Sequence, residues 1–254
     1  MSKTRTILVT GAAKGIGRAV AESFAGAGGH RLVLLDRDLG ELEGWTAGHP
    51  ARESIESHFA DIADLPGLQR LFEDLARRHG QIDVLVNSAG ICDENEPEDL
   101  DTWHRVIAVN LSGTFYVTAL CLPLIPRHGR IVNMASILGR AGKVRNTAYC
   151  ASKHGIVGMT KALALDLAAQ QITVNAILPA WVDTPMLRHE LAVQAGMAGL
   201  TPEQIQRNAR RKLPLRRFIQ SEEVAALVRY LASPEAAGVT AQSLVVDGGA
   251  GLGM

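Results

Sequence analysis

The chain is poor in the residues that mark disulfide-rich and metal-binding proteins. Its 254 residues include three cysteines, Cys92, Cys121 and Cys150. They are too few and too scattered for a disulfide framework, and none forms a CxxC pair. No cluster of histidine and cysteine has metal-ligand spacing, so we expect no metal site. Reduced thiols of this kind are typical of a cytoplasmic protein.

Excess charge and aromatic side chains are also missing. The formal net charge is zero, from 26 basic and 26 acidic side chains, and aromatic residues make up 4% of the chain. Such a composition does not favour binding to nucleic acid or to an anionic membrane. No uninterrupted apolar run reaches the roughly 18 residues of a membrane span. The N-terminal sequence MSKTRTILVTG leaves no room for a signal peptide.

The chain does show a regular alternation of short apolar runs and longer helical patterns. The apolar runs lie at 5–10, 31–36, 82–87, 129–136, 172–179 and 243–249, with a weaker one at 54–61. The helical patterns include 15–28, 65–79, 149–169 and 221–232. Near-continuous apolar strands are typical of a parallel sheet that is covered on both faces. The order therefore predicts an α/β fold with a doubly wound parallel sheet, as one domain over 1–254.

One stretch interrupts this alternation. Residues 184–216 have a helical pattern but contain no apolar strand run. They precede the last helix and strand, so they are expected to form an insertion near the carboxyl ends of the strands. We predict that this insertion covers the site as a substrate lid.

The sequence TGAAKGIG, residues 10–17, links the first strand to the first helix. Its three glycines, Gly11, Gly15 and Gly17, predict a turn whose backbone N–H groups face a pyrophosphate. The second strand ends at Asp36, where a carboxylate typically binds the ribose hydroxyls of NAD.

Two nearby cations point to the other nicotinamide cofactor. Lys14 and Arg37 are placed to reach the extra phosphate of NADP. The carboxylate of Asp36 would repel that phosphate, and it offers no positive charge to pair with it. NAD is therefore expected in preference to NADP.

The sequence AYCASK, residues 148–153, sets a phenol four residues before an ammonium group. On a helix, Tyr149 and Lys153 share one face. A free phenol has a pKa of roughly 10, and a base near neutral pH needs that lowered by about 3 units. A positive charge about 4 Å away supplies about 4 kcal/mol at an effective dielectric of 20. Lys153 would therefore suffice only in a site that is partly shielded from water.

Several further motifs occur in a characteristic order. They are NSAG at 87–90, VNLSGTF at 109–115, Ser136, YCASK at 149–153 and VNAILPAWVDTP at 174–185. Together with the glycine turn, and over essentially its full length, the chain resembles the short-chain dehydrogenase/reductase family in its classical type. This resemblance implies a Rossmann-type fold, a nicotinamide cofactor, and hydride transfer between an alcohol and a carbonyl.

The resemblance also implies a role for individual residues. Tyr149 would be the acid/base, and Lys153 would lower its pKa and hold the nicotinamide ribose. Ser136 would bind the substrate oxygen, and Asn110 would anchor a water that leads from Lys153 to solvent. The cofactor residues that it implies are Gly11, Lys14, Gly15, Ile16, Gly17, Asp36, Arg37, Asp61, Ile62, Asn87, Ala89, Gly90, Tyr149, Lys153, Pro179, Val182 and Thr184. The expected substrate residues are Ser136, Leu138, Asn146, Tyr149, Trp181, Met186 and Leu187.

The substrate class stays open at this level. Arg140, Lys143 and Arg145 either pair with an anionic substrate group or form a solvated basic loop. A small polyol, sugar or hydroxy acid oxidised with NAD is the first expectation. An NADPH-dependent 3-oxoacyl carrier-protein reductase and a non-catalytic dinucleotide-binding regulator are the alternatives. The resemblance further implies a homotetramer, paired through helices around 99–125 and 149–169.

Overall fold

The computed structural model describes residues 4–253. Seven strands form one sheet in the order β3-β2-β1-β4-β5-β6-β7, and all the described pairings are parallel. The strands are β1 (Arg5–Thr10), β2 (His30–Asp36), β3 (Ile55–Phe59), β4 (Val84–Asn87), β5 (Arg130–Met134), β6 (Thr173–Pro179) and β7 (Ser243–Val246). The order reverses between β1 and β4, which creates the crevice where such sheets bind ligands. The expected doubly wound α/β fold is confirmed.

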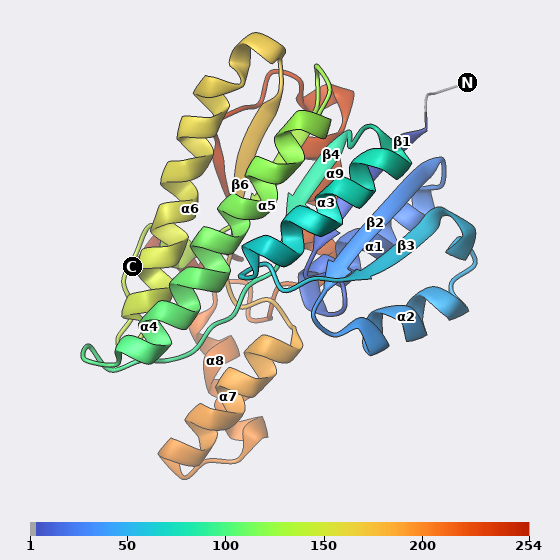
Figure 1. Cartoon of the computed structure of the whole chain (residues 1–254). Helices are drawn as coiled ribbons and strands as arrows, with labels where there is room; N and C mark the ends of the chain where they lie inside the picture. The colour runs from blue at the N-terminus through green and yellow to red at the C-terminus, as the bar shows by residue number, and fades with distance from the viewer. Residues whose placement is uncertain (1–3, 254) are drawn as a thin grey trace.

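Helices cover both faces of the sheet (Figure 1). Alternate residues of each strand point to opposite faces. In β1, Ile7 and Val9 pack in one core with α1 (Gly15–Ala27), α2 (Leu39–Gly48) and α9 (Ser221–Ala232). Leu8 packs in the other core with α3 (Leu65–His79), α5 (Thr114–Cys121) and α6 (Thr147–Asp166). Burial of both faces explains why the strand sequences are apolar without alternation.

The helical run after β4 changes its pitch part-way along. α4 (Leu100–Ile107) continues into a π-helical segment, Ala108–Gly113, and then into α5. The hydroxyl of Thr114 donates a 2.7 Å hydrogen bond to the carbonyl oxygen of Asn110. A π-helical turn inside an α-helix is rare and is found frequently at functional sites.

The stretch Leu100–Leu124 is long and apolar enough to cross a membrane, with a mean hydropathy of 1.6. This is weak evidence for a membrane span, because the core helices of soluble proteins have the same property. Here α4 contacts α6, and α5 contacts α3 and β4. Packing within the fold therefore accounts for part of the apolar composition, since 39% of the most apolar window is buried.

Residues 184–216 contain two helices, α7 (Pro185–Ala198) and α8 (Pro202–Lys212). They lie side by side at one end of the molecule (Figure 1). Leu187 and Leu191 of α7 form a small core of their own with Ala209, Leu213 and Phe218. The helix pair is thus a packed unit rather than an irregular loop.

Candidate active site

The glycine turn after β1 brings backbone very close to backbone. Gly11 and Gly15 have φ of 68° and 57°, a left-handed conformation that side chains rarely adopt. A Cβ at Gly17 would lie 2.1 Å from the carbonyl oxygen of Gly11, so only hydrogen fits there. α1 begins at Gly15, and the free N–H groups of its first turn suit an anion such as a pyrophosphate.

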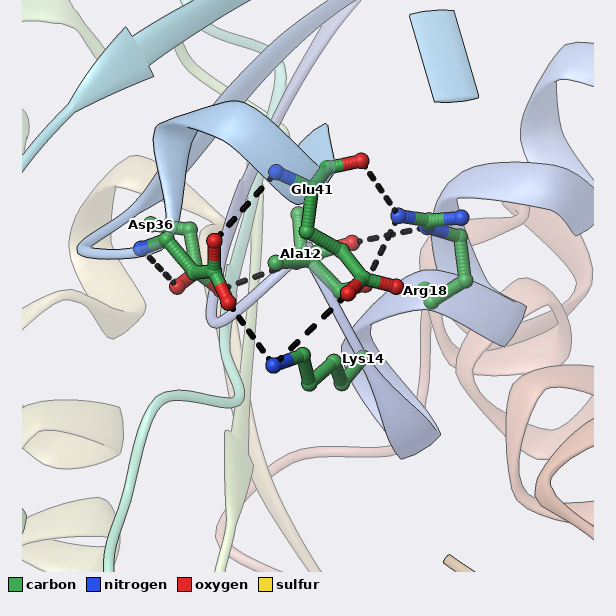
Figure 2. Close-up of polar contacts among 7 residues, drawn as sticks. Ala12, Lys14, Arg18, Asp36 and Glu41 are labelled. Atoms are coloured by element: carbon green, nitrogen blue, oxygen red, sulfur yellow. Dashed lines mark hydrogen bonds and ion pairs between the residues drawn. The ribbon is translucent and has the colours of Figure 1, made fainter. Parts of the chain in front are cut away.

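Asp36, at the end of β2, is tied to this turn (Figure 2). Its Oδ2 accepts a 2.8 Å hydrogen bond from the backbone N–H of Ala13, and its Oδ1 accepts one of 2.9 Å from that of Asp38. Arg18 holds the turn from the other side by donating to the carbonyl oxygens of Ala12 and Ala13. The carboxylate therefore has a fixed position beside the cleft.

The two cations that would favour NADP are both paired with carboxylates. Nζ of Lys14 lies 2.7 Å from Oδ2 of Asp38 and 3.7 Å from Oε2 of Glu41 (Figure 2). The hydrogen bond to Asp38 raises the pKa of Lys14. Arg37 lies 4.0 Å from Asp61.

A cleft of about 310 Å³ runs along this edge of the sheet. Most of the cofactor residues expected from the sequence line it: Gly11, Lys14, Gly15, Ile16, Gly17, Asp36, Arg37, Asp61, Ile62, Ala89, Gly90 and Thr184. Asn87 does not. It is buried below the cleft and donates to Thr118 and Asn133, both at 2.9 Å. Tyr149, Pro179 and Val182 line a neighbouring cavity instead, and Lys153 lines neither space.

The α6 helix brings Tyr149 and Lys153 together as the sequence predicts. Nζ of Lys153 lies 5.6 Å from the centre of the Tyr149 ring. It donates a 2.9 Å hydrogen bond to the carbonyl oxygen of Met134, at the end of β5. Lys153 is buried, and this burial lowers its pKa from 10.5 to about 8.

The pKa of Tyr149 moves in the direction opposite to the one the sequence led us to expect. Burial raises it above its usual value, the neighbouring Cys92 raises it further, and a hydrogen bond with Ser136 opposes both. Shielding from water strengthens the attraction of Lys153 but also makes the charged phenolate costly to form. The protein groups described here thus do not lower the tyrosine pKa by themselves.

Ser136 and Asn110 flank this pair. Ser136 follows β5, and its Oγ accepts a hydrogen bond from the backbone N–H of Leu138. Asn110 lies in the π-helical segment and exchanges hydrogen bonds of 2.8 and 2.9 Å with the backbone of Ile91, while also donating to Ser152. Asn110 therefore fixes the segment after β4 against α6.

A second cavity of about 390 Å³ opens beside Tyr149. It shares Ile16, Thr184 and Met186 with the cofactor cleft, so the two spaces adjoin. Six of the seven expected substrate residues line it: Ser136, Leu138, Tyr149, Trp181, Met186 and Leu187. Asn146 does not. It is fully buried, and its amide donates to the carbonyl oxygen of Val144.

The loop before α6 contains three basic side chains, and each of them contacts a different partner. Arg140 donates to the carbonyl oxygen of Ser243, and Arg145 forms ion pairs with Glu94 and Glu96. Only Lys143 lines the second cavity, where it pairs with Glu190.

Sequence reasoning had no signal for Glu190 or Cys92 as cavity residues. Glu190 lies on α7, whose register against the loop depends on tertiary packing. Cys92 is half-buried, and its Sγ lies 3.9 Å from Oδ1 of Asn146. Burial raises its pKa to about 12, so its thiol is not a reactive thiolate.

Known proteins are similar to this chain over almost its whole length. A family model described as Enoyl-(Acyl carrier protein) reductase matches residues 11–251. The chain belongs to the short-chain dehydrogenase/reductase family. It is an oxidoreductase that acts on alcohols or ketones, and it binds a nicotinamide dinucleotide.

Individual members differ in their chemistry. The chain is 36% identical to D-beta-hydroxybutyrate dehydrogenase of Rhizobium meliloti, over 97% of this chain and 98% of that protein. It is also 36% identical to the 3-oxoacyl-(acyl-carrier-protein) reductase FabG of Thermotoga maritima, over 96% and 97%. A crystal structure of an actinorhodin polyketide ketoreductase variant with NADPH has a TM-score of 0.91 and 37% identity, over 98% and 97%.

The cofactor cleft fits the group that this family binds. The glycine turn would cradle a pyrophosphate, and Asp36 stands at the edge of the same cleft. When bound, a nicotinamide dinucleotide supplies the hydride chemistry that protein side chains lack.

Proposed function

We propose that the protein is an NAD-dependent dehydrogenase of a short hydroxy acid, interconverting a secondary alcohol and a ketone. The observation that carries this proposal is the second cavity. Ser136 and Tyr149 line this cavity, which adjoins the cofactor cleft, and Lys143 lines it together with its partner Glu190.

Each catalytic side chain has a role that its contacts support. The hydroxyl of Tyr149 exchanges a proton with the substrate oxygen, and Ser136 holds that oxygen by a hydrogen bond. Lys153 is held by Met134 beside the tyrosine and takes part in the proton movement. Asn110 is a positioning residue, because it fixes the segment around Ile91 against α6.

The preference for NAD rests on the charges around the ribose end of the cleft. Asp36 is locked in place by two backbone N–H groups, and Lys14 is neutralised by Asp38. A 2′-phosphate would meet a fixed carboxylate and no unpaired cation from Lys14 or Arg37.

The character of the second cavity supports a hydroxy acid over a polyol or sugar. Its walls include Ile137, Leu138, Trp181, Met186 and Leu187. Apolar walls leave most of a polyol's hydroxyls without partners, and unpaired buried hydroxyls are costly. A short carbon chain suits these walls, and its single carboxylate would take Lys143 over from Glu190, which lines the same cavity. D-beta-hydroxybutyrate dehydrogenases among the relatives support the same class.

An NADPH-dependent 3-oxoacyl carrier-protein reductase is the second candidate. It is favoured by relatives with that name and by the similar ketoreductase structure with NADPH. The two candidates share a 3-oxo/3-hydroxy substrate pattern, so cofactor choice separates them.

The experiment is an assay of cofactor reduction on short hydroxy acids, polyols, sugars and neutral secondary alcohols, with NAD⁺ and NADP⁺ in parallel. We expect turnover of a hydroxy acid with NAD⁺, and its loss in Tyr149→Phe. Turnover of a 3-oxoacyl thioester with NADPH alone would establish the reductase instead. Binding of NADH without turnover of any alcohol or ketone would identify a dinucleotide-binding regulator.

Three further properties belong to the proposal. The α7–α8 unit acts as the substrate lid, because Met186, Leu187 and Glu190 of α7 line the second cavity. The exposed Leu165 and Phe115 support subunit pairing into a homotetramer through α5 and α6; a stable monomer in light scattering would refute it. Three free cysteines are compatible with a reducing, cytoplasmic location.

A further inference from the structure

Positive charge is concentrated on α8 and the loop after it. Residues 202–217 include six basic side chains and one acidic side chain, in a chain whose formal net charge is zero. Four of the six line one cavity of about 390 Å³, namely Arg207, Arg210, Arg211 and Arg216, together with Glu203 and Gln206. This cavity, which we call the arginine cleft, shares no lining residue with the cofactor cleft or the substrate cavity.

The cleft arginines lack acidic partners. Among residues 4–253, none of the four forms an ion pair with a carboxylate. Arg210 donates to the side-chain oxygen of Gln206 at 3.3 Å, and Arg216 donates to the carbonyl oxygen of Arg211. Arg217, which lies outside the cleft lining, shows the contrast: it donates to both carboxylate oxygens of Glu223, at 2.6 and 2.8 Å.

The backbone brings one of these cations to the cleft by an unfavourable conformation. Arg216 has a φ of 56°, in the left-handed region where glycine is the usual residue. Arg216 lines the cleft together with residues of α8. A charged residue is thus held where glycine would be easier, and the four cleft arginines have one carboxylate, that of Glu203, in the cleft lining.

The cleft has a rigid floor. The guanidinium of Arg210 lies 4.9 Å from the centre of the Phe218 ring. Phe218 stacks on Trp181 with ring centres 6.3 Å apart and planes at 8°, and Trp181 lines the substrate cavity. Ala209 and Leu213 are buried against α7. Packed side chains therefore support the arginines from below. A ligand in the cleft would also contact the α7–α8 unit, which borders the substrate cavity.

We propose that the arginine cleft binds a phosphate or diphosphate group of a small ligand. A guanidinium group can donate two parallel hydrogen bonds to the oxygens of one phosphate. Several guanidinium groups around one concave site can therefore bind several oxygens of a phosphate or diphosphate. The cleft is a pocket of small-molecule size rather than a broad flat surface. Ligand binding would relieve the repulsion among the four cations.

The test is calorimetric titration of the full-length protein with inorganic phosphate and with pyrophosphate at low ionic strength. Saturating NADH is present so that the glycine turn is occupied. The variant Arg207→Gln/Arg211→Gln removes two cleft charges whose side chains make no other hydrogen bond or ion pair among the described residues. The matched control, Arg52→Gln/Arg70→Gln, removes two exposed charges elsewhere. Circular dichroism verifies that each variant is folded.

We expect saturable binding of pyrophosphate, weakened at least tenfold in the cleft variant and unchanged in the control, and reduced by added salt. Equal affinity of wild type and cleft variant would overturn the proposal, and so would the absence of binding at low salt. A tri-glutamate peptide that binds as tightly as pyrophosphate would overturn the assignment to phosphate. The comparison between variants depends neither on turnover nor on the choice of NAD, so it can fail independently of the proposed function.

Discussion

Lys153 lies one helical turn after Tyr149 on α6, with its Nζ 5.6 Å from the centre of the tyrosine ring. The same ammonium group donates to the carbonyl oxygen of Met134, and its burial lowers its pKa to about 8. The lysine next to the proposed acid/base therefore loses its positive charge as the pH rises through about 8.

The first prediction concerns stability against pH. Between pH 8 and pH 10.5 the unfolded chain keeps the proton of Lys153 while the folded chain has released it. Stability from this group therefore rises with pH through that window and is lost as the pH falls to 8. The full difference is about 3 kcal/mol. Denaturant unfolding of wild type and Lys153→Met should show their difference moving in favour of the wild type as pH rises. The exposed Lys161→Met on the same helix should show no such trend.

The second prediction concerns cofactor choice. Asp38→Asn removes the charge that neutralises Lys14 but keeps an oxygen to accept from the backbone N–H of Glu41. Lys14 would then keep only the more distant Glu41 as a partner and could attract a 2′-phosphate, so kcat/KM with NADP⁺ should rise severalfold while NAD⁺ is still used. Asp36→Asn removes the fixed charge and should lower the preference for NAD⁺ by about tenfold. If neither substitution changes the ratio of the two kcat/KM values, the charges at this edge do not select the cofactor.

The third prediction compares two glycines of α1. A Cβ at Gly17 would press on the backbone of Gly11, whereas at Gly26 it would meet nothing within 4 Å. Gly17→Ala should therefore force the turn and helix apart, costing at least about 2 kcal/mol by the usual scale of overpacking. Gly26→Ala should stabilise the helix by roughly 0.5–1 kcal/mol. Thermal unfolding of both variants measures the contrast, and equal melting temperatures would contradict it.

The fourth prediction uses the Lys143–Glu190 pair in the substrate cavity. Lys143→Met should raise KM for a short hydroxy acid about tenfold, the loss expected for one charge-assisted hydrogen bond. KM for a neutral secondary alcohol should stay the same. Glu190→Gln releases the lysine from its partner and should lower KM for the acid. An unchanged KM for the acid in Lys143→Met would show that the lysine does not contact the substrate.

The sequence predicted the features that depend on local order along the chain. The apolar strands, the turn from Gly11 to Gly17 and the Tyr149–Lys153 spacing each follow from residues close in sequence, and the structure places them as expected. The parallel sheet then brings the strand ends to one edge, which explains why most of the predicted cofactor residues line one cleft.

Some features of the second cavity could not be predicted from the sequence, because they depend on packing between distant segments. Asn146 sits three residues before Tyr149, yet it points inward, where Cys92 and the backbone around Val144 surround it. Lys143 and Glu190 meet across 47 residues of sequence. No pattern in either segment indicates that contact, so the loop cations could not be told apart from the sequence alone.

The π-helical segment Ala108–Gly113 makes chain length adjustable at one point in the middle of the fold. A wide turn holds one residue more than an α-helical turn, so loss of one residue here would leave a regular α-helical turn with α5 facing the sheet as before. Loss of one residue within the first turn of α5 would instead rotate the rest of that helix by about 100°. Thr118 would then leave its contact with Asn87, and Cys121 would leave the core beside the sheet. Natural variants that differ by one residue in this helical run should therefore differ at the π-helical turn and not within α5.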